Sequence, residues 1–241
     1  MSHILRLLLC IAVSLVSLAA HADEFTPAQR AEIIRILRDA LKQDPSILRD
    51  AVTAMQSDES DRQRSALAAV KDTLVDPRDP VGGNPHGDVT IVEFFDTRCP
   101  YCRKMEPAMA ALLARDRGIR LVYKDLPILG PASVLGSKAL LAAQAQGGYE
   151  KLREAIMAAP PQTTKAMIQD AAQRLGLDWK RLEHDMDNPA VQARIDTNLK
   201  LAHTIGIEGT PALVIGGALI PGAVEMADLT NAVATARKAK E

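Results

Sequence analysis

Two cysteines stand three positions apart where an apolar run gives way to a helical pattern, and this junction constrains the fold more than any other feature of the chain. Residues 89–95 (VTIVEFF) are mostly apolar or β-branched, which predicts a buried β-strand. A short turn follows at residues 96–98, and the pattern from residue 99 to about residue 115 predicts a helix containing Pro107. Cys99 and Cys102 therefore fall on the first turn of a helix that leaves a strand, as a crossover helix does.

This placement predicts that the two sulfurs differ in reactivity. Cys99 falls at the N-cap, where its sulfur can accept hydrogen bonds from the backbone N–H groups of Tyr101 and Cys102. The positive end of the helix dipole and the neighbouring Arg98 and Arg103 also favour an anion. We therefore expect a lowered pKa for Cys99, which would attack a disulfide, and a shielded Cys102 that would resolve the mixed disulfide.

Two other uses of the cysteine pair are less favoured by the sequence. A purely structural disulfide would close a loop of only four residues and restrict the unfolded chain little. A metal site would need two further ligands, and His86, His184 and His203 are not paired at ligand spacing. The sequence thus predicts redox chemistry without a metal or cofactor.

The first residues of the chain have the pattern of an export signal. Arg6 precedes an apolar run of about 14 residues, too short to span a bilayer comfortably, and Ala20-His21-Ala22 places small residues where a signal peptidase cuts. We expect residues 1–22, which include Cys10, to be removed on the way to the periplasm. An uncleaved N-terminal anchor is the alternative.

Composition excludes several classes of protein. The chain has 241 residues, of which 47% are apolar and 24% charged, the balance of an ordinary globular protein. Its net charge of −1 gives no basic field for nucleic acid, and 3% aromatic residues leave few surfaces on which bases could stack. We therefore expect no nucleic-acid partner.

Residues 23–75 are predicted to form helices. Thr26-Pro27-Ala28-Gln29 carries an N-cap, a proline at the first helical position and a glutamine three residues after the cap. Asp44-Pro45 repeats the cap and proline, and a third helical stretch covers about residues 58–74. The apolar stripes of these helices are expected to pack either on the neighbouring domain or on another subunit.

The order of elements after a Pro- and Gly-rich stretch at residues 76–87 predicts an α/β domain over residues 76–241. Strands are expected at residues 89–95, 119–123, 212–215 and 218–220, with helices after the first and last of them. A long helical stretch, about residues 131–206, interrupts this order. Without it the order is βαβ followed by ββα, which is the thioredoxin fold with a helical insertion.

Two further motifs belong to the same predicted site. Pro211 stands directly before an apolar strand, and a cis peptide bond after Thr210 would explain its position. The Thr210 backbone would then be free to pair with an extended substrate chain opposite Cys99. Glu93 is an acid inside a buried strand, which suggests a carboxylate paired with Lys124 that relays the proton of Cys102, although strand alternation could simply point it to solvent.

These motifs resemble the DsbA-like thioredoxin-fold proteins of the bacterial periplasm. The likeness covers about residues 76–241 and is carried by residues 92–96 (VEFFD), 99–102 (CPYC), 124–130 (KDLPILG) and 209–211 (GTP). Residues 24–29 are similar to the ScsC-type branch, in which N-terminal helices can oligomerise the protein. The resemblance implies thiol–disulfide exchange on exported proteins.

By the same resemblance each matching residue has an implied role. Cys99 would be the nucleophile, Cys102 the resolving cysteine and Pro211 the cis-proline, with Glu93 and Lys124 as a buried pair. Substrate is expected to contact Pro100, Tyr101 and Thr210. Tyr101 and Thr210 replace the His and Val of DsbA and are similar to the isomerase-type relatives DsbC and DsbG, which favours isomerisation or reduction over strong oxidation.

The expected partners follow from this interpretation. They are exported proteins with thiols or disulfides, an unknown membrane redox partner, and further copies of the chain held through residues 23–75. Two alternatives are a copper(I)-binding or thiol-protecting protein, since two soft thiolates can hold Cu(I), and a chaperone-like module that uses the N-terminal helices.

Overall fold

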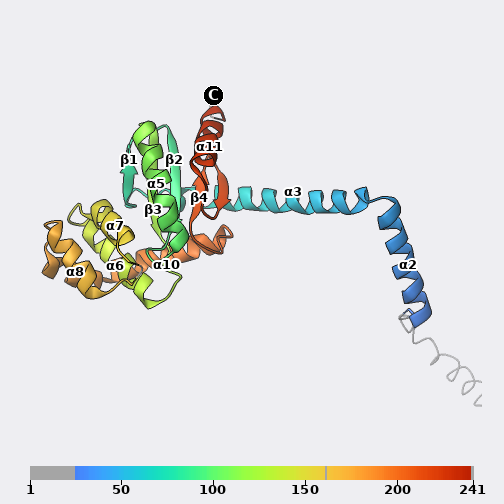
Figure 1. The fold of residues 1–241 in the computed structure, drawn as a ribbon, viewed down its shortest axis with the longest axis horizontal. Helices are drawn as coiled ribbons and strands as arrows, with labels where there is room; N and C mark the ends of the chain where they lie inside the picture. Colours follow the sequence, from blue (N-terminus) through green and yellow to red (C-terminus); the bar gives the residue numbers. More distant parts are fainter. Residues whose placement is uncertain (1–24, 161, 240–241) are drawn as a thin grey trace, which may run out of the picture. The chain divides into compact units, whose positions relative to one another are not determined.

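A mixed β-sheet forms the centre of the larger of two units in the computed structural model, which describes residues 25–160 and 162–239. The two units divide between Asp58 and Glu59. The predicted signal peptide lies outside the described residues. The strand order is β1–β3–β2–β4–β5, with β2 parallel to β3 and the other neighbours antiparallel (Figure 1). The strands are β1 (Val81–Gly83), β2 (Val89–Phe95), β3 (Ile119–Asp125), β4 (Ala212–Ile215) and β5 (Ala218–Pro221).

Helices complete the predicted order. Helix α5 (Pro100–Arg115) crosses over from β2 to β3, and α11 (Met226–Lys238) follows β5. The segment between β3 and β4 is helical, as predicted, and α6, α7 and α8 gather beside the sheet (Figure 1). Its helices are α6 (Pro131–Gln144), α7 (Tyr149–Ala158), α8 (Lys165–Arg174), α9 (Trp179–Met186) and α10 (Pro189–Thr204). The fold is therefore the thioredoxin fold with a helical insertion, which confirms the expectation from element order.

The sheet buries side chains on both faces. Ile91 and Phe95 of β2 pack in a core with residues of α5, α6, α7 and α11. Val92 and Phe94 of the same strand pack in a second core with residues of α4 (Lys71–Leu74) and α10. Because successive side chains of a strand point to opposite faces, Glu93 shares the face of Ile91 and Phe95, toward α5.

The N-terminal helices start as the sequence predicts but break differently. Helix α2 (Pro27–Gln43) begins with the complete capping box of Thr26 and Gln29. The expected second and third helical stretches form one continuous helix, α3 (Ser46–Ala69), followed by the short α4 (Lys71–Leu74). No Gly or Pro interrupts the polar stretch inside α3, and ion pairs three residues apart, such as Arg64 with Asp61, support it.

The boundary between the two units differs from the one expected after residue 75. Leu67 of α3 and Leu74 of α4 are buried in the core on the second face of the sheet. Residues 59–75 therefore belong to the larger unit, and this part of the helical segment packs on its own chain. In contrast, α2 has no buried residue, and its apolar side chains are exposed.

Strand β1 was expected to be part of an irregular loop. It is only three residues long and contains two glycines, so neither length nor pattern marks it as a strand. Gly83 has a φ of 67°, and a Cβ atom there would lie 2.7 Å from the Ile119 carbonyl oxygen. Pairing with β3 thus depends on a residue type that sequence rules associate with loops. No helix in the described part of the chain is long and apolar enough to span a membrane.

Candidate functional site

Cys99 occupies the N-cap of α5, immediately after the turn that follows β2. The position is the predicted one, but the thiol does not make the hydrogen bond of a capping side chain. Instead its Sγ donates to the carbonyl oxygen of Thr210 at 3.1 Å. Cys99 is 4% exposed and Cys102 fully buried, and both are free thiols. The structure therefore describes the dithiol form of the pair.

The electrostatics separate the two thiols. The hydrogen bond from the Cys102 thiol is the largest influence on Cys99. Against the effect of burial, this bond, the Thr210 side chain and the backbone N–H groups of Cys102 and Tyr101 favour the thiolate and lower the pKa of Cys99 to about 5. For Cys102 the hydrogen bond to Cys99 and burial raise the pKa far above that of a free thiol. At neutral pH Cys99 is thus a thiolate and Cys102 a thiol. Thiol–disulfide exchange needs one sulfur in the reactive thiolate form, and Cys99 provides it.

The loop before β4 lies against the nucleophile. The Thr210–Pro211 peptide bond is cis, as expected from the position of the proline before a strand. The carbonyl oxygen of Thr210 faces Cys99, so the structure brings these distant parts of the sequence together. Thr210 also lines a groove of about 320 Å³ with Tyr101 and Met105 of α5. The groove therefore lies beside the cysteine pair, with Thr210 shared between the two.

Exposed side chains surround the pair. Pro100 is exposed, and the Tyr101 side chain is 62% exposed at the first turn of α5. Ile128 and Leu129, in the loop after β3, are also large, apolar and exposed. Apolar residues of this size at the surface beside a reactive thiol are typical of a site that binds another protein chain.

The turn between β2 and Cys99 is held by a buried acid that the sequence analysis did not identify as functional. Asp96 is fully buried, and its Oδ2 accepts hydrogen bonds from the backbone N–H groups of Ile128 and Leu129 at 2.9 and 3.0 Å. Its backbone carbonyl accepts from the Cys99 N–H at 3.0 Å. Asp96 thus fixes both the cysteine turn and the apolar loop beside it. Its position directly after the strand, at the end of the motif at residues 92–96, was the signal that could have identified it.

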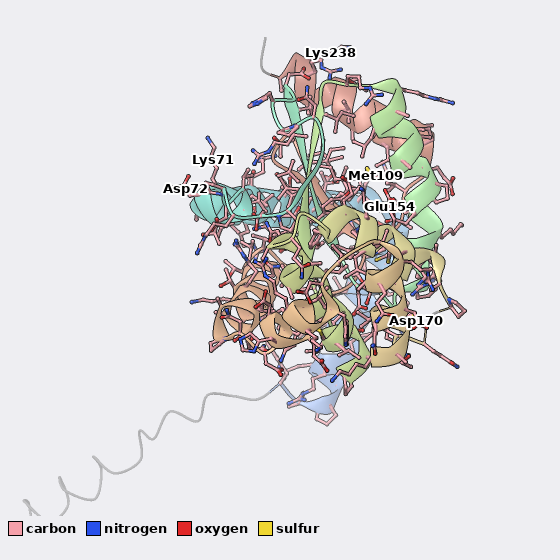
Figure 2. The ribbon with its side chains drawn as sticks, turned by 90° about the vertical axis from the view of Figure 1, so that its left-hand side faces the viewer. Lys71, Asp72, Met109, Glu154, Asp170 and Lys238 are labelled. Carbon is pink, nitrogen blue, oxygen red and sulfur yellow. The ribbon has the colours of Figure 1, made fainter. Side chains whose placement is uncertain are left out.

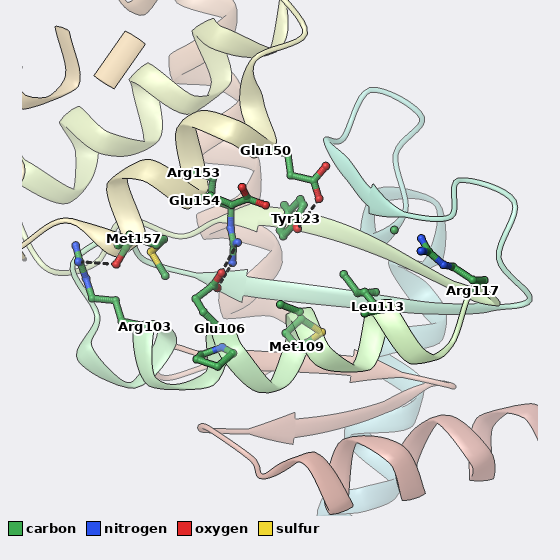
Figure 3. A pocket seen from close by; sticks show the side chains of 15 residues that line it. Arg103, Glu106, Met109, Leu113, Arg117, Tyr123, Glu150, Arg153, Glu154 and Met157 are labelled. Carbon is green, nitrogen blue, oxygen red and sulfur yellow. Dashed lines mark hydrogen bonds and ion pairs between the residues drawn. The ribbon is translucent and has the colours of Figure 1, made fainter. Parts of the chain in front are cut away.

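Arg103 joins the same turn to the helical insertion. Its guanidinium donates to the Thr97 carbonyl oxygen through Nε at 3.1 Å and Nη2 at 2.6 Å. It also donates to the carbonyl oxygens of Met157, at 2.9 Å, and Ala159 (Figure 3). Arg103, which was expected from the sequence to favour the Cys99 thiolate, therefore forms a bridge between the turn and the end of α7.

The predicted pair of Glu93 and Lys124 is wrong. In the parallel register of β2 and β3, Glu93 lies opposite Tyr123, whereas Lys124 lies opposite Phe94, so the two side chains point to opposite faces of the sheet. Glu93 is fully buried, and its Oε2 lies 3.1 Å from Nη2 of Arg153 in α7. Sequence reasoning missed Arg153 because it is 60 residues away, in the inserted helices.

Lys124 has partners of its own on the other face. Its Nζ lies 2.6 Å from Oδ2 of Asp79 and donates to the carbonyl oxygen of Thr73 at 2.8 Å. Arg194 of α10 pairs with the other oxygen of Asp79 at 3.2 Å. Lys124 therefore ties the end of α4 to the sheet and is not placed to act on the cysteines.

Among residues 25–160 and 162–239, no three His, Cys, Asp or Glu side chains come together as a metal site would require. Cys99 and Cys102 have sulfur and backbone groups as neighbours, and the reactive centre consists of the dithiol, the cis-proline loop and the groove beside it. Fold and site together define a thioredoxin-like protein with a redox-type cysteine pair at the start of its crossover helix.

Comparison with known families gives the particular family. The protein-family model described as "DSBA-like thioredoxin domain" matches residues 90–234. The chain therefore belongs to the DsbA-like family of thiol–disulfide oxidoreductases. The match includes the cysteines, the cis-proline loop and the whole helical insertion.

Solved structures show the same fold. A thioredoxin-like oxidoreductase from Silicibacter pomeroyi DSS-3 is 44% identical, with a TM-score of 0.68, and the match covers 70% of this chain and 98% of that one. Proteus mirabilis ScsC in a transitional conformation is 28% identical, with a TM-score of 0.67, over 89% of this chain and all of the other. The second match extends into the N-terminal helices.

Curated relatives include two kinds of protein. The Na⁺/H⁺ antiporter NhaA 3 of Salinispora tropica is 31% identical over 183 residues, which is 73% of this chain but only 28% of the antiporter. The thiol:disulfide interchange protein DsbA of Burkholderia cepacia is 29% identical over 139 residues, 55% of this chain and 65% of that protein. This chain thus spans under a third of the antiporter and about two thirds of the DsbA protein.

Proposed function

We propose that this protein is a periplasmic thiol–disulfide oxidoreductase that acts on exported proteins through Cys99 and Cys102. The observation that carries the proposal is the Cys99 thiol, which has a pKa of about 5 and lies 3.1 Å from the Thr210 carbonyl oxygen of the cis-proline loop. A thiolate at neutral pH beside a groove open to an extended chain is suited to attack a disulfide. The relatives named DsbA and ScsC support the same activity.

The reaction is balanced by the two cysteines alone. The Cys99 thiolate attacks one sulfur of a substrate disulfide, a mixed disulfide forms, and the other substrate sulfur leaves as a thiolate. Cys102 then loses its proton and attacks Cys99, which releases the second substrate thiolate and leaves the Cys99–Cys102 disulfide. Two electrons pass from the protein to the substrate. The reverse sequence oxidises a substrate dithiol.

Substrate recognition uses the groove and the apolar side chains around the pair. Tyr101, Ile128 and Leu129 offer exposed apolar surface to a partly folded client. The backbone of Thr210 lies where an extended client segment would pass Cys99, and backbone pairing there would not depend on the client's sequence. Such a site accepts many unrelated exported proteins. A periplasmic location agrees with the expected export signal at residues 1–22.

Within this activity, we favour disulfide isomerisation by an oligomer. Residues of α2 and the first half of α3 expose an unusual set of large apolar side chains, and stripes of this kind are normally covered by a partner helix. The set is Ile33, Ile34, Ile36, Leu37, Leu41, Ile47, Leu48, Val52 and Met55, with Phe25 just before α2. Further copies of the chain are the partner proposed here, because joined active sites act on one misfolded client at high effective concentration.

Trapping of mixed disulfides tests the activity. The Cys102→Ala variant should accumulate covalent complexes with periplasmic client proteins, because the resolving attack is lost, whereas Cys99→Ala should form none. Complexes are detected on non-reducing gels and disappear on reduction. Equal yields from both variants would contradict the assignment of the two roles.

A comparison of two activities tests the preference for isomerisation. Two rates are measured for the intact protein and for a DsbA protein: reactivation of a client with scrambled disulfides, and oxidation of a simple dithiol peptide. The ratio of the first rate to the second should be higher for the intact protein than for the DsbA protein. A protein that oxidises dithiols rapidly but does not reactivate scrambled client would instead be an oxidase.

A further inference from the structure

A row of charged side chains runs from strand β2, which precedes the cysteines, to the surface between α5 and α7. It starts at Glu93, which is fully buried, and continues through Arg153, whose side chain is 3% exposed. The Arg153 guanidinium pairs with both carboxylate oxygens of Glu106, Nη2 at 2.5 Å and Nη1 at 2.9 Å (Figure 3). Glu106 is 24% exposed and lines a groove of about 720 Å³, so this row of charged side chains ends at solvent.

The guanidinium is fixed by more than its ion pairs. It lies between two aromatic rings, 4.5 Å from the centroid of Phe95 and 4.4 Å from that of Tyr123. Cation–π contacts in a buried site hold a positive charge in one place. Met109 and Glu154, labelled in Figure 2, line the same groove as Glu106 and Arg153. The positive charge next to Glu93 is therefore held in one place by its ion pairs and by the two rings.

The charged and titratable groups that face Glu93 come from three elements. Leu213 of β4, its other strand neighbour, is apolar. The groups that interact with Glu93 directly are Cys102 and Glu106 of α5, Tyr123 of β3 and Arg153 of α7. The next groups out, which act on Cys102, Tyr123 or Arg153, are Arg103, Asp125, Tyr149 and Glu150. Arg153 and Arg103 are the cations among them, and only Arg153 pairs with Glu93.

The balance at Glu93 leaves it close to half ionised at neutral pH. Burial raises its pKa to about 7, with Arg153 opposing this and Glu106 adding to it. One carboxylate oxygen, Oε1, has no hydrogen-bond partner among the described residues. The Glu93 charge also contributes to the raised pKa of Cys102, after the hydrogen bond to Cys99 and burial. Glu93 is therefore coupled to the thiol that must lose a proton.

We propose that Arg153, supplied by the helical insertion, is a positioning residue that keeps Glu93 able to accept the proton of Cys102 during the resolving step. This proposal rests on the proposed disulfide chemistry. The Cys102 S–H bond breaks, its proton goes to a Glu93 carboxylate oxygen, and the Cys102 sulfur forms a bond to Cys99. The bond between Cys99 and the client sulfur breaks, and the client leaves as a thiolate.

Without Arg153, burial and the Glu106 charge would act on Glu93 unopposed. The carboxyl would then be protonated at neutral pH and could not accept a proton. Glu106 has the opposite influence, since its negative charge disfavours a second carboxylate nearby. Removal of Arg153 should therefore shift the pH midpoint of the resolving step upward, and removal of the Glu106 charge should shift it downward. Loss of packing alone would not produce shifts of opposite sign.

The two steps can be followed separately with dithiobis(nitrobenzoate), which releases one coloured thiolate at each step. The first release reports the attack by Cys99, and the second reports the attack by Cys102 on the mixed disulfide. Rapid mixing over a range of pH is carried out on the full mature chain and on Arg153→Met, Arg153→Lys and Glu106→Gln. Arg174→Met, at an exposed arginine of α8, is the matched control.

Arg153→Met should slow the second release about tenfold at pH 7 and move its midpoint upward, with the first release unchanged. Arg153→Lys should restore much of the rate, and Glu106→Gln should move the midpoint downward. An unchanged second release in folded Arg153→Met, or shifts in the same direction in both variants, would overturn the proposal. If Arg153→Met does not fold, Glu106→Gln decides: a downward shift supports the proposal, and no shift overturns it.

Failure of the proposed function would look different. A parent protein with a normal second release that captures no client protein would contradict the proposed substrate class and leave the role of Arg153 intact. A parent protein that captures clients, with variants that leave the second release unchanged, would contradict only the role of Arg153.

Discussion

At the scale of single residues, the cysteine pair has the clearest consequence for pH dependence. Because the pKa of Cys99 is lowered to about 5, its alkylation by iodoacetamide should reach half of its maximal rate near pH 5. Cys102 should stay unmodified up to high pH, since hydrogen bonding to Cys99 and burial raise its pKa. Mass spectrometry of peptides containing each cysteine measures both rates. Equal rates at the two sulfurs across pH would contradict the asymmetry.

The stability of the reduced protein should follow the same pKa. The folded state binds fewer protons than the unfolded state between about pH 5 and the pKa of a free thiol, about 8.5, so Cys99 stabilises the reduced form increasingly as pH rises through this range. This contribution is lost as pH falls to 5. Cys99→Ser should lack it, which urea unfolding of reduced parent and variant at pH 5 and pH 8 would detect.

Glu93 should act in the opposite sense. Its pKa is raised by burial to about 7, so the folded state holds the proton more tightly and loses stability as pH rises from about 4.5 to 7. Glu93→Gln should therefore gain stability relative to the parent between pH 5 and pH 8, on the order of 2 kcal/mol. Glu154→Gln, at an exposed residue of α7, should show no such change in urea unfolding. A constant difference across pH would contradict the buried carboxylate's role.

The chemistry of the pair could be predicted from local sequence, whereas the partner of Glu93 could not. A strand, a turn and a helix fix Cys99 at the N-cap without any knowledge of the rest of the chain. The partner of Glu93 depends on strand register and on which inserted helix covers that face. Lys124 was chosen because it lies at the end of the adjacent strand, but the register places it one position too far along and so on the opposite face.

At the scale of elements, the ion pair of Lys124 and Asp79 joins α4 to the sheet. Both side chains are 1% exposed, and Lys124 also satisfies the Thr73 carbonyl oxygen. Lys124→Met should therefore destabilise the protein by about 3–5 kcal/mol, because the buried Asp79 keeps only the backbone N–H of Asp76 and the more distant Arg194 as partners. The double variant with Asp79→Asn should recover part of this loss in urea unfolding.

The same variant tests whether Lys124 influences the redox pair. Its side chain lies on the face of the sheet away from α5, so the alkylation midpoint of Cys99 should be unchanged in Lys124→Met. A shifted midpoint would restore a role for Lys124 in the proton relay.

The helices themselves were predicted well because their caps and periodicity are local. Strand β1 was missed because only pairing with β3 makes its glycines a strand.

At the scale of the whole molecule, the division between the units decides where the chain can be cut. A chain that begins at Glu59 keeps Leu67 and Leu74 and should fold with an intact cysteine pair. It should be monomeric by light scattering, whereas the full mature chain should be an oligomer, since the exposed apolar residues of α2 and the first half of α3 are removed. A monomeric full chain would contradict the proposed assembly.

A chain that begins at residue 76 should behave differently. It lacks Leu67 and Leu74, and the loss of each buried leucine is expected to cost about 2–5 kcal/mol. It also loses the Thr73 carbonyl that Lys124 binds. This chain should therefore unfold at much lower urea concentration than the one that begins at Glu59. The sequence could not show the boundary at residues 58–59. The helical stretch predicted at about residues 58–74 starts with polar residues, and only the structure shows that its later apolar residues are buried in the core.

The anchoring of α4 has a mechanical consequence. Tension applied to the chain before residue 59 would meet the core first at Leu67, and then at Thr73 and Asp79, where Lys124 holds a backbone carbonyl and a carboxylate on the face of the sheet away from α5. These buried contacts stand between the N-terminal helices and strand β2, which leads into the turn that carries Cys99. A pull on those helices should therefore be resisted by residues 67–79 before it disturbs the geometry that makes the thiol reactive.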